Sequence, residues 1–126
     1  MEAQQDFKKL LALFNAHNVA YVIVGAYALS YHGAPRYTGD LDILVQPAAE
    51  NAQRILDALS EFGFGNLELM LKDFTALDNV IQLGYPPVRI DLITSITGVS
   101  WEEVDKNKET GTYGGVKIFY IGRPQL

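Results

Sequence analysis

The sequence predicts an α/β (α+β) fold in which helices pack against a mixed β-sheet. Three observations predict it. Apolar residues recur at helical spacing near the N-terminus, short β-branched runs alternate with helical segments, and a Gly-Gly pair separates two strand-like runs near the C-terminus. The predicted order of elements is α-β-α-β-α-β-β-α-β-β, and 126 residues are expected to form a single domain.

The first half of the chain predicts a helix followed by alternating strands and helices. Residues 4–17 are expected to form an amphipathic helix, because their apolar residues recur at i, i+3, i+4 and i+7. The next expected elements are a strand at 20–24, a short helix at 26–32, a loop at 35–39 and a strand at 40–45 that has one mostly apolar face and one face that begins acidic.

The second half predicts two strand pairs separated by a helix. A helix is expected to begin with Pro47 as its first residue and to stop at Gly63, whereas 64–78 has no clear pattern. The remaining expected elements are strands at 79–83 and 88–94, a short helix capped by Ser100, and strands at 110–113 and 116–121 joined by a Gly-Gly hairpin turn.

The composition argues against a disordered chain and against a protein that binds nucleic acid by charge alone. A hydrophobic fraction of 48% argues against a disordered chain. The formal charge is −5, from 15 acidic and 10 basic residues, and no block of Lys and Arg is present. Strong charge-driven binding to nucleic acid is therefore not expected. An acidic protein can still act on phosphates when metal ions bridge the two negative partners.

The sequence also predicts where the protein works. No apolar run approaches the roughly 20 residues that a membrane helix needs, and the N-terminus lacks the pattern of a signal peptide. The absence of cysteine excludes disulfides, thiol catalysis and Cys-ligated zinc. A cytoplasmic protein without membrane segments is expected. No helix follows the last predicted strand to cover it, so C-terminal truncation of the domain is a further expectation.

Asp40 and Asp42 are the first candidate site residues. Positions i and i+2 of a strand point to the same face, roughly 6.5–7 Å apart along the chain. At that spacing two carboxylates can share one metal ion, or span a pair of ions about 3.5–4 Å apart. The position of the pair favours a functional site over an ordinary solvated strand face, because the strand begins directly after a loop.

Gly25 and Ala26 lie where a strand is expected to meet a helix. A glycine there allows a tight turn and a close approach of the backbone to a ligand. The free N–H groups of the first helical turn form an anion site suited to phosphate. Alone, such a junction is more often plain geometry than a binding site.

Asp91 is an acidic residue inside a predicted strand. Burying an unpaired carboxylate is costly, so its charge needs a partner. The partner is either an arginine, Arg89 or Arg36, or a metal ion shared with Asp40 and Asp42. Two unit charges 4 Å apart repel by about 4 kcal/mol at an effective dielectric constant of 20, so three clustered carboxylates need a cation.

Together these segments resemble the DNA polymerase beta-like nucleotidyltransferase superfamily. The resemblance rests on Val24-Gly25-Ala26, then Asp40-Leu41-Asp42, then the strand-borne Asp91. The segments 27–28, 32–33, 35–38 and 86–95 further resemble small bacterial members related to the nucleotidyltransferases of abortive-infection and toxin–antitoxin systems. The resemblance covers about residues 20–122, and it implies a single nucleotidyltransferase domain over 1–126.

The resemblance implies a site and a reaction. Asp40 and Asp42 would hold two Mg²⁺ (or Mn²⁺) ions, and Asp91 would complete the catalytic metal site and accept the proton of the attacking hydroxyl. Gly25 and Ala26 would bind the phosphates of an NTP such as ATP. The reaction would move a nucleoside monophosphate onto a hydroxyl of tRNA, a protein or a small molecule and release pyrophosphate. Ala26 departs from the Gly or Ser usual in the family.

Some alternatives remain open at this point. Arg36 would bind a triphosphate or neutralise the carboxylates, since arginine suits both. Phosphatases and glycosyltransferases that use Asp-x-Asp fit less well, because here a loop precedes the motif and the chain is short. The main alternative is a non-catalytic nucleotide-binding or antitoxin-type partner module on the same fold.

Overall fold

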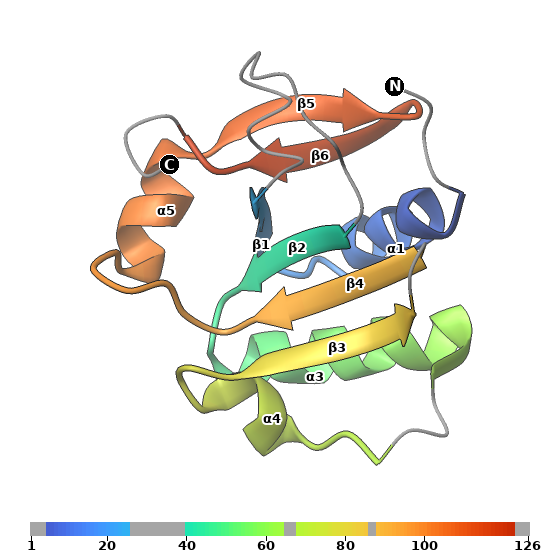
Figure 1. Ribbon diagram of the computed structural model, residues 1–126, viewed down its shortest axis with the longest axis horizontal. Helices are drawn as coiled ribbons and strands as arrows, with labels where there is room; N and C mark the ends of the chain where they lie inside the picture. Colours follow the sequence, from blue (N-terminus) through green and yellow to red (C-terminus); the bar gives the residue numbers. More distant parts are fainter. Residues whose placement is uncertain (1–4, 26–39, 65–67, 86–87, 123–126) are drawn as a thin grey trace.

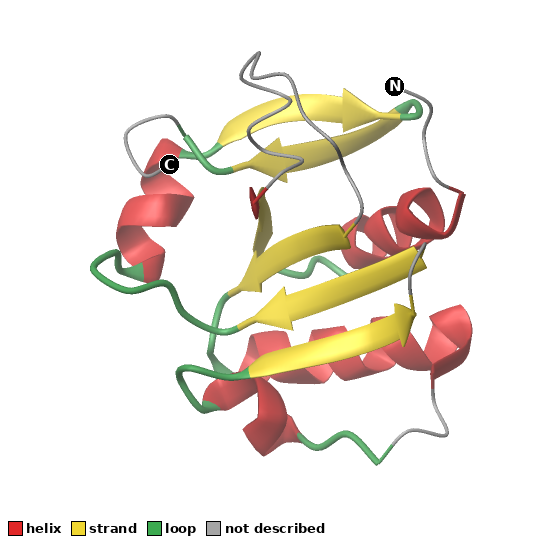
Figure 2. Cartoon of the chain, in the orientation of Figure 1, coloured by secondary structure: helices red, strands yellow, loops and turns green. Residues whose placement is uncertain are grey.

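The computed structural model describes residues 5–25, 40–64, 68–85 and 88–122 (Figures 1 and 2). They form a mixed six-stranded sheet with helices, which confirms the predicted fold class. None of the helices in these ranges is both long and apolar enough to cross a membrane. In chain order the described elements are α1 (Gln5–Ala16), β1 (Tyr21–Val24), β2 (Asp40–Val45), α3 (Ala49–Leu59), the π-helical segment η1 (Ser60–Phe64), α4 (Leu71–Thr75), β3 (Val80–Tyr85), β4 (Val88–Ile93), α5 (Trp101–Asn107), β5 (Glu109–Tyr113) and β6 (Val116–Tyr120).

The sheet has the strand order β3-β4-β2-β1-β6-β5. Strand β2 runs parallel to β4 and antiparallel to β1, and β1 runs parallel to β6. The outer pairs β3–β4 and β5–β6 are antiparallel. Because β2 lies between β1 and β4, the acidic segment that begins it lies in the middle of the sheet.

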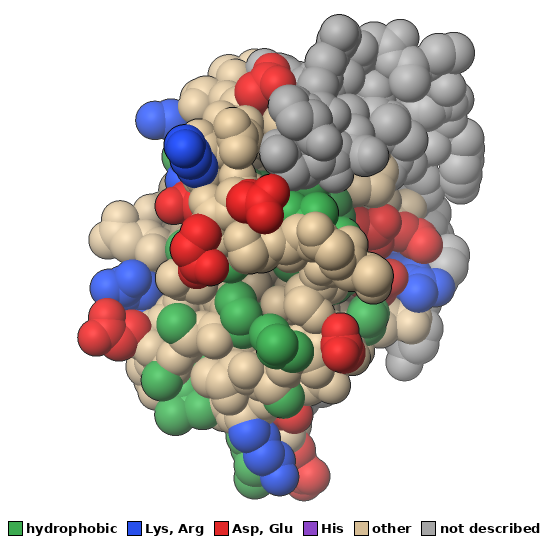
Figure 3. Space-filling view, turned by 90° about the vertical axis from the view of Figure 1, so that its left-hand side faces the viewer, with side chains coloured by type: hydrophobic (Ala, Val, Ile, Leu, Met, Phe, Trp, Pro, Cys, Tyr) green, Lys and Arg blue, Asp and Glu red, His purple; other side chains and the backbone are tan. Residues whose placement is uncertain are grey.

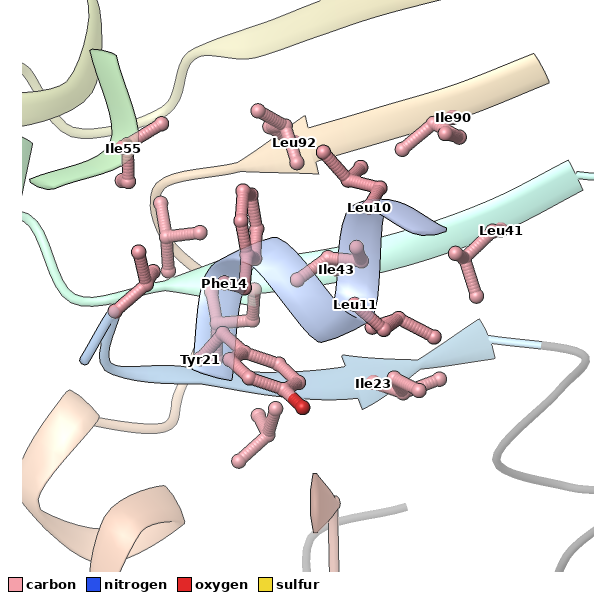
Figure 4. Close-up of a cluster of buried hydrophobic side chains, with 14 of the residues drawn as sticks. Leu10, Leu11, Phe14, Tyr21, Ile23, Leu41, Ile43, Ile55, Ile90 and Leu92 are labelled. Carbon is pink, nitrogen blue, oxygen red and sulfur yellow. The ribbon is translucent and has the colours of Figure 1, made fainter. Parts of the chain in front are cut away.

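Helices α1 and α3 cover one face of the sheet, and the hydrophobic core lies beneath them (Figure 4). The four apolar residues of α1 at the predicted spacing are all buried, which confirms the amphipathic helix. The apolar residues of β2 and β4 that face these helices are also buried. The side chains of this core include Leu10, Phe14, Leu41, Ile43, Ile55, Ile90 and Leu92.

Two local predictions near the C-terminus are confirmed. Gly114 and Gly115 have φ values of 57° and 86°, the left-handed geometry that a two-residue hairpin turn requires. The Ser100 side chain accepts a hydrogen bond of 3.2 Å from the Glu103 N–H, so Ser100 caps α5. Both features follow from local residue chemistry, and distant contacts do not override them.

The prediction that Pro47 is the first residue of a helix is wrong. Helix α3 begins at Ala49, because the chain first turns away from β2. In that turn the carbonyl of Gln46 accepts hydrogen bonds from the Ala48 N–H and from the side chain of Asn51. The segment 64–78, which carried no clear pattern, contains α4, and the helix predicted at 26–32 lies outside the described residues.

Asn51 is a buried polar residue that ties α3 to the ends of β1 and β2, and only 1% of its surface is exposed. Its side chain accepts from the Ala20 N–H at 2.7 Å and donates to the carbonyls of Ala20 and Gln46, each at 3.0 Å. These bonds fix where both central strands leave the sheet. Asn51 therefore holds the strand that carries the acidic segment in register with its neighbour.

We expect Asn51→Ala to lower the free energy of unfolding by roughly 2–3 kcal/mol, because it removes three hydrogen bonds and leaves the partly buried Ala20 N–H without its partner. Urea denaturation measures this effect. Gln53→Ala, on the exposed side of the same helix, is the control and should change stability by no more than about 0.5 kcal/mol. Equal effects of the two substitutions would contradict this role of Asn51.

Candidate active site

The strand register brings the predicted carboxylates together. Strands β2 and β4 are parallel neighbours, with Asp42 opposite Asp91 and Asp40 opposite Arg89. Residues in register on neighbouring strands point to the same face. All four side chains therefore lie on the face of the sheet opposite the core beneath α1 and α3, where the intervening apolar residues of both strands point. We call these four residues the acidic face.

The carboxylate side chains of the acidic face differ in how much of their surface is exposed. The side chain of Asp40, at the start of β2, is 41% exposed, whereas that of Asp91 is only 11% exposed. Asp42, like Asp40, is partly buried. The most buried carboxylate is thus the one that sequence reasoning singled out as needing a partner.

Arg89 is the partner of Asp91 in this structure. Its Nε and Nη2 donate to Asp91 Oδ1 and Oδ2 respectively, each at 3.1 Å, and its Nε lies 3.7 Å from Asp40 Oδ2. The hydrogen bonds to Asp91 and the surrounding carboxylates raise the pKa of the Arg89 guanidinium. Of the partners considered for Asp91, the structure shows Arg89 in place, as a two-pronged ion pair.

Asp42 has no such compensation. Burial, together with the negative charges of Asp91 and Asp40, raises the pKa of its carboxyl to about 6, against an ordinary value of 3.8. Arg89 lowers the pKa of Asp42, but by less than these effects raise it. The ionised carboxylate of Asp42 is therefore in a local excess of negative charge, which a bound cation would relieve.

Gly25, directly after β1, lies against the Asp42 carboxylate. Its φ of 73° is the left-handed conformation that favours glycine. A Cβ atom built at this position would overlap Asp42 Oδ2. The sequence predicts that Gly25 lets the backbone approach a ligand closely. The structure gives a second reason for glycine at this position, since a larger residue would leave no room for the Asp42 carboxylate.

The three carboxylates of the acidic face are of the chemical type that binds a divalent cation. Carboxylate oxygens are the ligands that Mg²⁺ and Mn²⁺ prefer, and the excess negative charge at Asp42 favours a cation. In the described ranges, however, no three acidic or histidine side chains are already arranged as a metal site. Arg89 engages both oxygens of Asp91, so a metal ion at Asp91 would compete with this ion pair.

Two predicted nucleotide-binding residues cannot be placed. Ala26 and Arg36 lie outside the described residues, so their contacts with phosphate remain predictions. The four residues that the structure does place, Gly25, Asp40, Asp42 and Asp91, come from three segments of the sequence and meet on one part of the sheet.

Asp73 and Asp78 lie in the segment that carries no clear sequence pattern, and the structure gives each a defined role. Asp73 accepts a hydrogen bond of 2.7 Å from the Met70 N–H and so caps α4. Asp78 has a φ of 61° and exchanges hydrogen bonds of 2.8 Å with Ser95. An acidic residue three positions after the N-cap is typical of a capping box. Here the N-cap residue is Met70, which is not a usual capping residue, so the sequence gives only a weak signal.

A comparison with solved structures identifies a similar fold. The "putative nucleotidyltransferase" TM1012 from Thermotoga maritima matches with a TM-score of 0.65 and 17% sequence identity, over 96% of this chain and 78% of that one. No family model matches the sequence. No curated protein matches it either. At this identity the likeness establishes only that the two chains share a fold.

Proposed function

We propose that the protein is a metal-dependent nucleotidyltransferase that moves a nucleoside monophosphate from an NTP to a hydroxyl acceptor and releases pyrophosphate. The observation that carries the proposal is the register of Asp42 with Asp91 on neighbouring parallel strands. It supports a shared cation site on a sheet whose fold matches that of a nucleotidyltransferase. The proposed metal ligands are Asp40, Asp42 and Asp91.

Bound Mg²⁺ or Mn²⁺ would supply charge neutralisation for the phosphates and for the transition state. The residues of the chain would do the rest. The backbone at Gly25 and Ala26 would position the phosphates. Asp42, set against Gly25, would hold the cation that neutralises the reacting end of the nucleotide near Asp91. Asp91 would accept the proton of the attacking hydroxyl.

Arg89 has a defined part in this proposal. It neutralises Asp91 before the nucleotide and metal arrive, which limits the cost of a buried carboxylate. When the ion pair opens, the guanidinium stays on the same face of the sheet as the carboxylates. From there it would bind a phosphate oxygen, since arginine suits phosphate and carboxylate alike.

The test is release of pyrophosphate from each NTP in the presence of Mg²⁺ and candidate hydroxyl acceptors. We expect release that EDTA stops and that Asp91→Asn reduces by on the order of 100-fold, since even residues that only orient metal ligands contribute about 10- to 100-fold. Glu68→Gln, which removes an exposed carboxylate elsewhere, is the control and should be unaffected. Equal activity of Asp91→Asn and wild type would rule out this mechanism.

The same assay separates the alternative function, a nucleotide-binding or antitoxin-type module without turnover. That alternative predicts a higher melting temperature with NTP and Mg²⁺ but no pyrophosphate. The relation to abortive-infection and toxin–antitoxin nucleotidyltransferases is part of the proposal, and it rests on sequence resemblance alone. The lack of cysteine supports the cytoplasm as the place of action.

A further inference from the structure

A cavity of about 480 Å³ opens beside the acidic face, between the ends of β2 and β4 and the start of α5. This volume is typical of sites for small molecules. Leu44, Ile96, Val99 and Trp101 provide apolar lining, and Asp78 and Glu102 provide carboxylates. We call this space the Trp101 pocket.

The lining of the Trp101 pocket favours a cation with an apolar part. It contains no Lys, Arg or His, so a triphosphate would meet only negative charge there. An indole ring attracts cations through its face, and nearby carboxylates add to that attraction. Among the described residues, neither Asp78 nor Glu102 forms an ion pair with a basic side chain. Figure 3 shows this side of the molecule, where acidic side chains lie around a hydrophobic centre.

The hydrogen bonds around Asp78 hold one of these carboxylates in place. The Asp78 N–H donates to Ser95 Oγ, and the same hydroxyl donates to Asp78 Oδ1, both at 2.8 Å. The adjacent Asn79 is bound in turn to Thr94, which lies at the end of β4. The Asp78 carboxylate is thus positioned before any ligand arrives, which lowers the entropic cost of binding.

The position of the Trp101 pocket relative to the acidic face indicates which substrate it takes. Leu44 lines the pocket and lies on the same face of β2 as Asp42, two residues or roughly 7 Å further along. Gly25 lies on the opposite side of Asp42, because β1 runs antiparallel to β2 and Val24 pairs with Asp42. In an in-line displacement the attacking and leaving oxygens are on opposite sides of the phosphorus.

We propose that the Trp101 pocket binds the acceptor, and that the acceptor is a small hydroxyl compound carrying an ammonium group. This inference rests on the proposed function. The acceptor oxygen forms a bond to the α-phosphorus of the NTP while the bond from that phosphorus to the bridging oxygen breaks. The electron pair of the broken bond leaves with pyrophosphate, and the hydroxyl proton passes to Asp91.

The experiment uses the fluorescence of Trp101, which is the only tryptophan in the chain and lies in the pocket. The probes are choline and its neutral isostere 3,3-dimethylbutan-1-ol, which both carry a hydroxyl and differ in charge. We expect choline to change the fluorescence saturably, with an affinity about 10-fold higher than that of the isostere. Asp78→Asn with Glu102→Gln should remove this preference, and asparagine tolerates the positive φ of residue 78.

Equal affinities for choline and the isostere, or a preference that survives the double substitution in a folded protein, would overturn the inference. The Glu68→Gln variant should bind choline as wild type does, because Glu68 does not line the pocket. Choline binding without pyrophosphate release by any acceptor would count against the proposed function. Transfer to tRNA or protein at a rate that the substitutions in the pocket leave unchanged would overturn this inference but not the proposed function.

Discussion

Asp42→Asn is expected to abolish nucleotidyl transfer and, at the same time, to stabilise the metal-free protein at neutral pH. The loss of transfer should be on the order of 100-fold or more, because the substitution removes a charged ligand from the proposed cation site. The gain in stability follows from the charge crowding at this carboxylate, whose pKa is raised to about 6. Few substitutions on the sheet should have such opposite effects on activity and stability.

The pH dependence of the stability effect has a definite sign. Burial and the neighbouring carboxylates Asp91 and Asp40 disfavour ionisation of Asp42, while Arg89 favours it. A carboxyl whose folded pKa exceeds its unfolded value stabilises the protein fully below the unfolded pKa, here 3.8. That contribution is lost as the pH rises towards and through the folded pKa of about 6. Asparagine does not ionise, so the variant should not lose it.

Melting temperatures of wild type and Asp42→Asn, measured without metal from about pH 4 to about pH 8, test this sign. The melting temperature of the variant should rise relative to that of wild type mainly between the unfolded and folded pKa values of Asp42. At higher pH the difference in melting temperature should stay constant. Added Mg²⁺ should raise the melting temperature of wild type but not of the variant. The Glu68→Gln control should follow wild type. A constant difference at all pH values would contradict the charge-crowding account.

Gly25→Ala is expected to reduce both stability and transfer. Holding a non-glycine residue at φ 73° costs on the order of 1–3 kcal/mol. The new methyl group would also overlap Asp42 Oδ2, which adds a packing cost of about 1–3 kcal/mol unless the carboxylate moves. A displacement of Asp42 by about 1 Å is enough to lower transfer on the order of 100-fold.

Gly115→Ala is the matched control for Gly25→Ala. Its φ of 86° is similarly strained for a side chain, but nothing lies within 4 Å of a Cβ atom added there. The control should therefore lose stability by the backbone cost alone and keep full transfer. Urea denaturation and pyrophosphate release, measured on both variants, separate the two costs. If Gly25→Ala transferred as well as Gly115→Ala, the contact between Gly25 and Asp42 would have no functional role.

Much of the fold could be predicted because it depends on local patterns. The helical spacing of the apolar residues in α1 matches one buried face. Leu41, Ile43 and Val45 of β2 are likewise buried on one face, although Leu44 on the other face is buried too. The glycines at the β5–β6 turn and the Ser100 cap depend on only a few neighbouring residues. Such features follow from residue chemistry within one element, so the sequence alone contains them.

Other features depend on contacts between distant segments and could not be predicted. The start of α3 is set by Asn51, whose hydrogen bonds reach back to Ala20 and Gln46 across the ends of two strands. The strand order, with β6 added parallel to β1, is equally non-local. The Trp101 pocket forms only where three separate segments meet, so in the sequence Asp78 looks like an ordinary loop residue and Glu102 like an ordinary acid at a helix start.

The clustering of the three aspartates could be predicted from the sequence, but their present pairing could not. An acidic residue between buried neighbours in a strand indicates a compensated carboxylate, and Asp91 is one. The sequence left open whether an arginine or a metal ion compensates it. The structure shows Arg89 bound to Asp91, with Asp42 beside it in an excess of negative charge.

In the proposed mechanism, Asp42 and Asp91 share a divalent cation when nucleotide is bound. The most direct measurement is a crystal structure with Mn²⁺ and a non-hydrolysable NTP, in which anomalous scattering locates the manganese. We predict a manganese peak within coordination distance of both carboxylates, with Arg89 turned away from Asp91. A fully occupied nucleotide with no manganese at these carboxylates, and with the Arg89–Asp91 ion pair intact, would contradict the account.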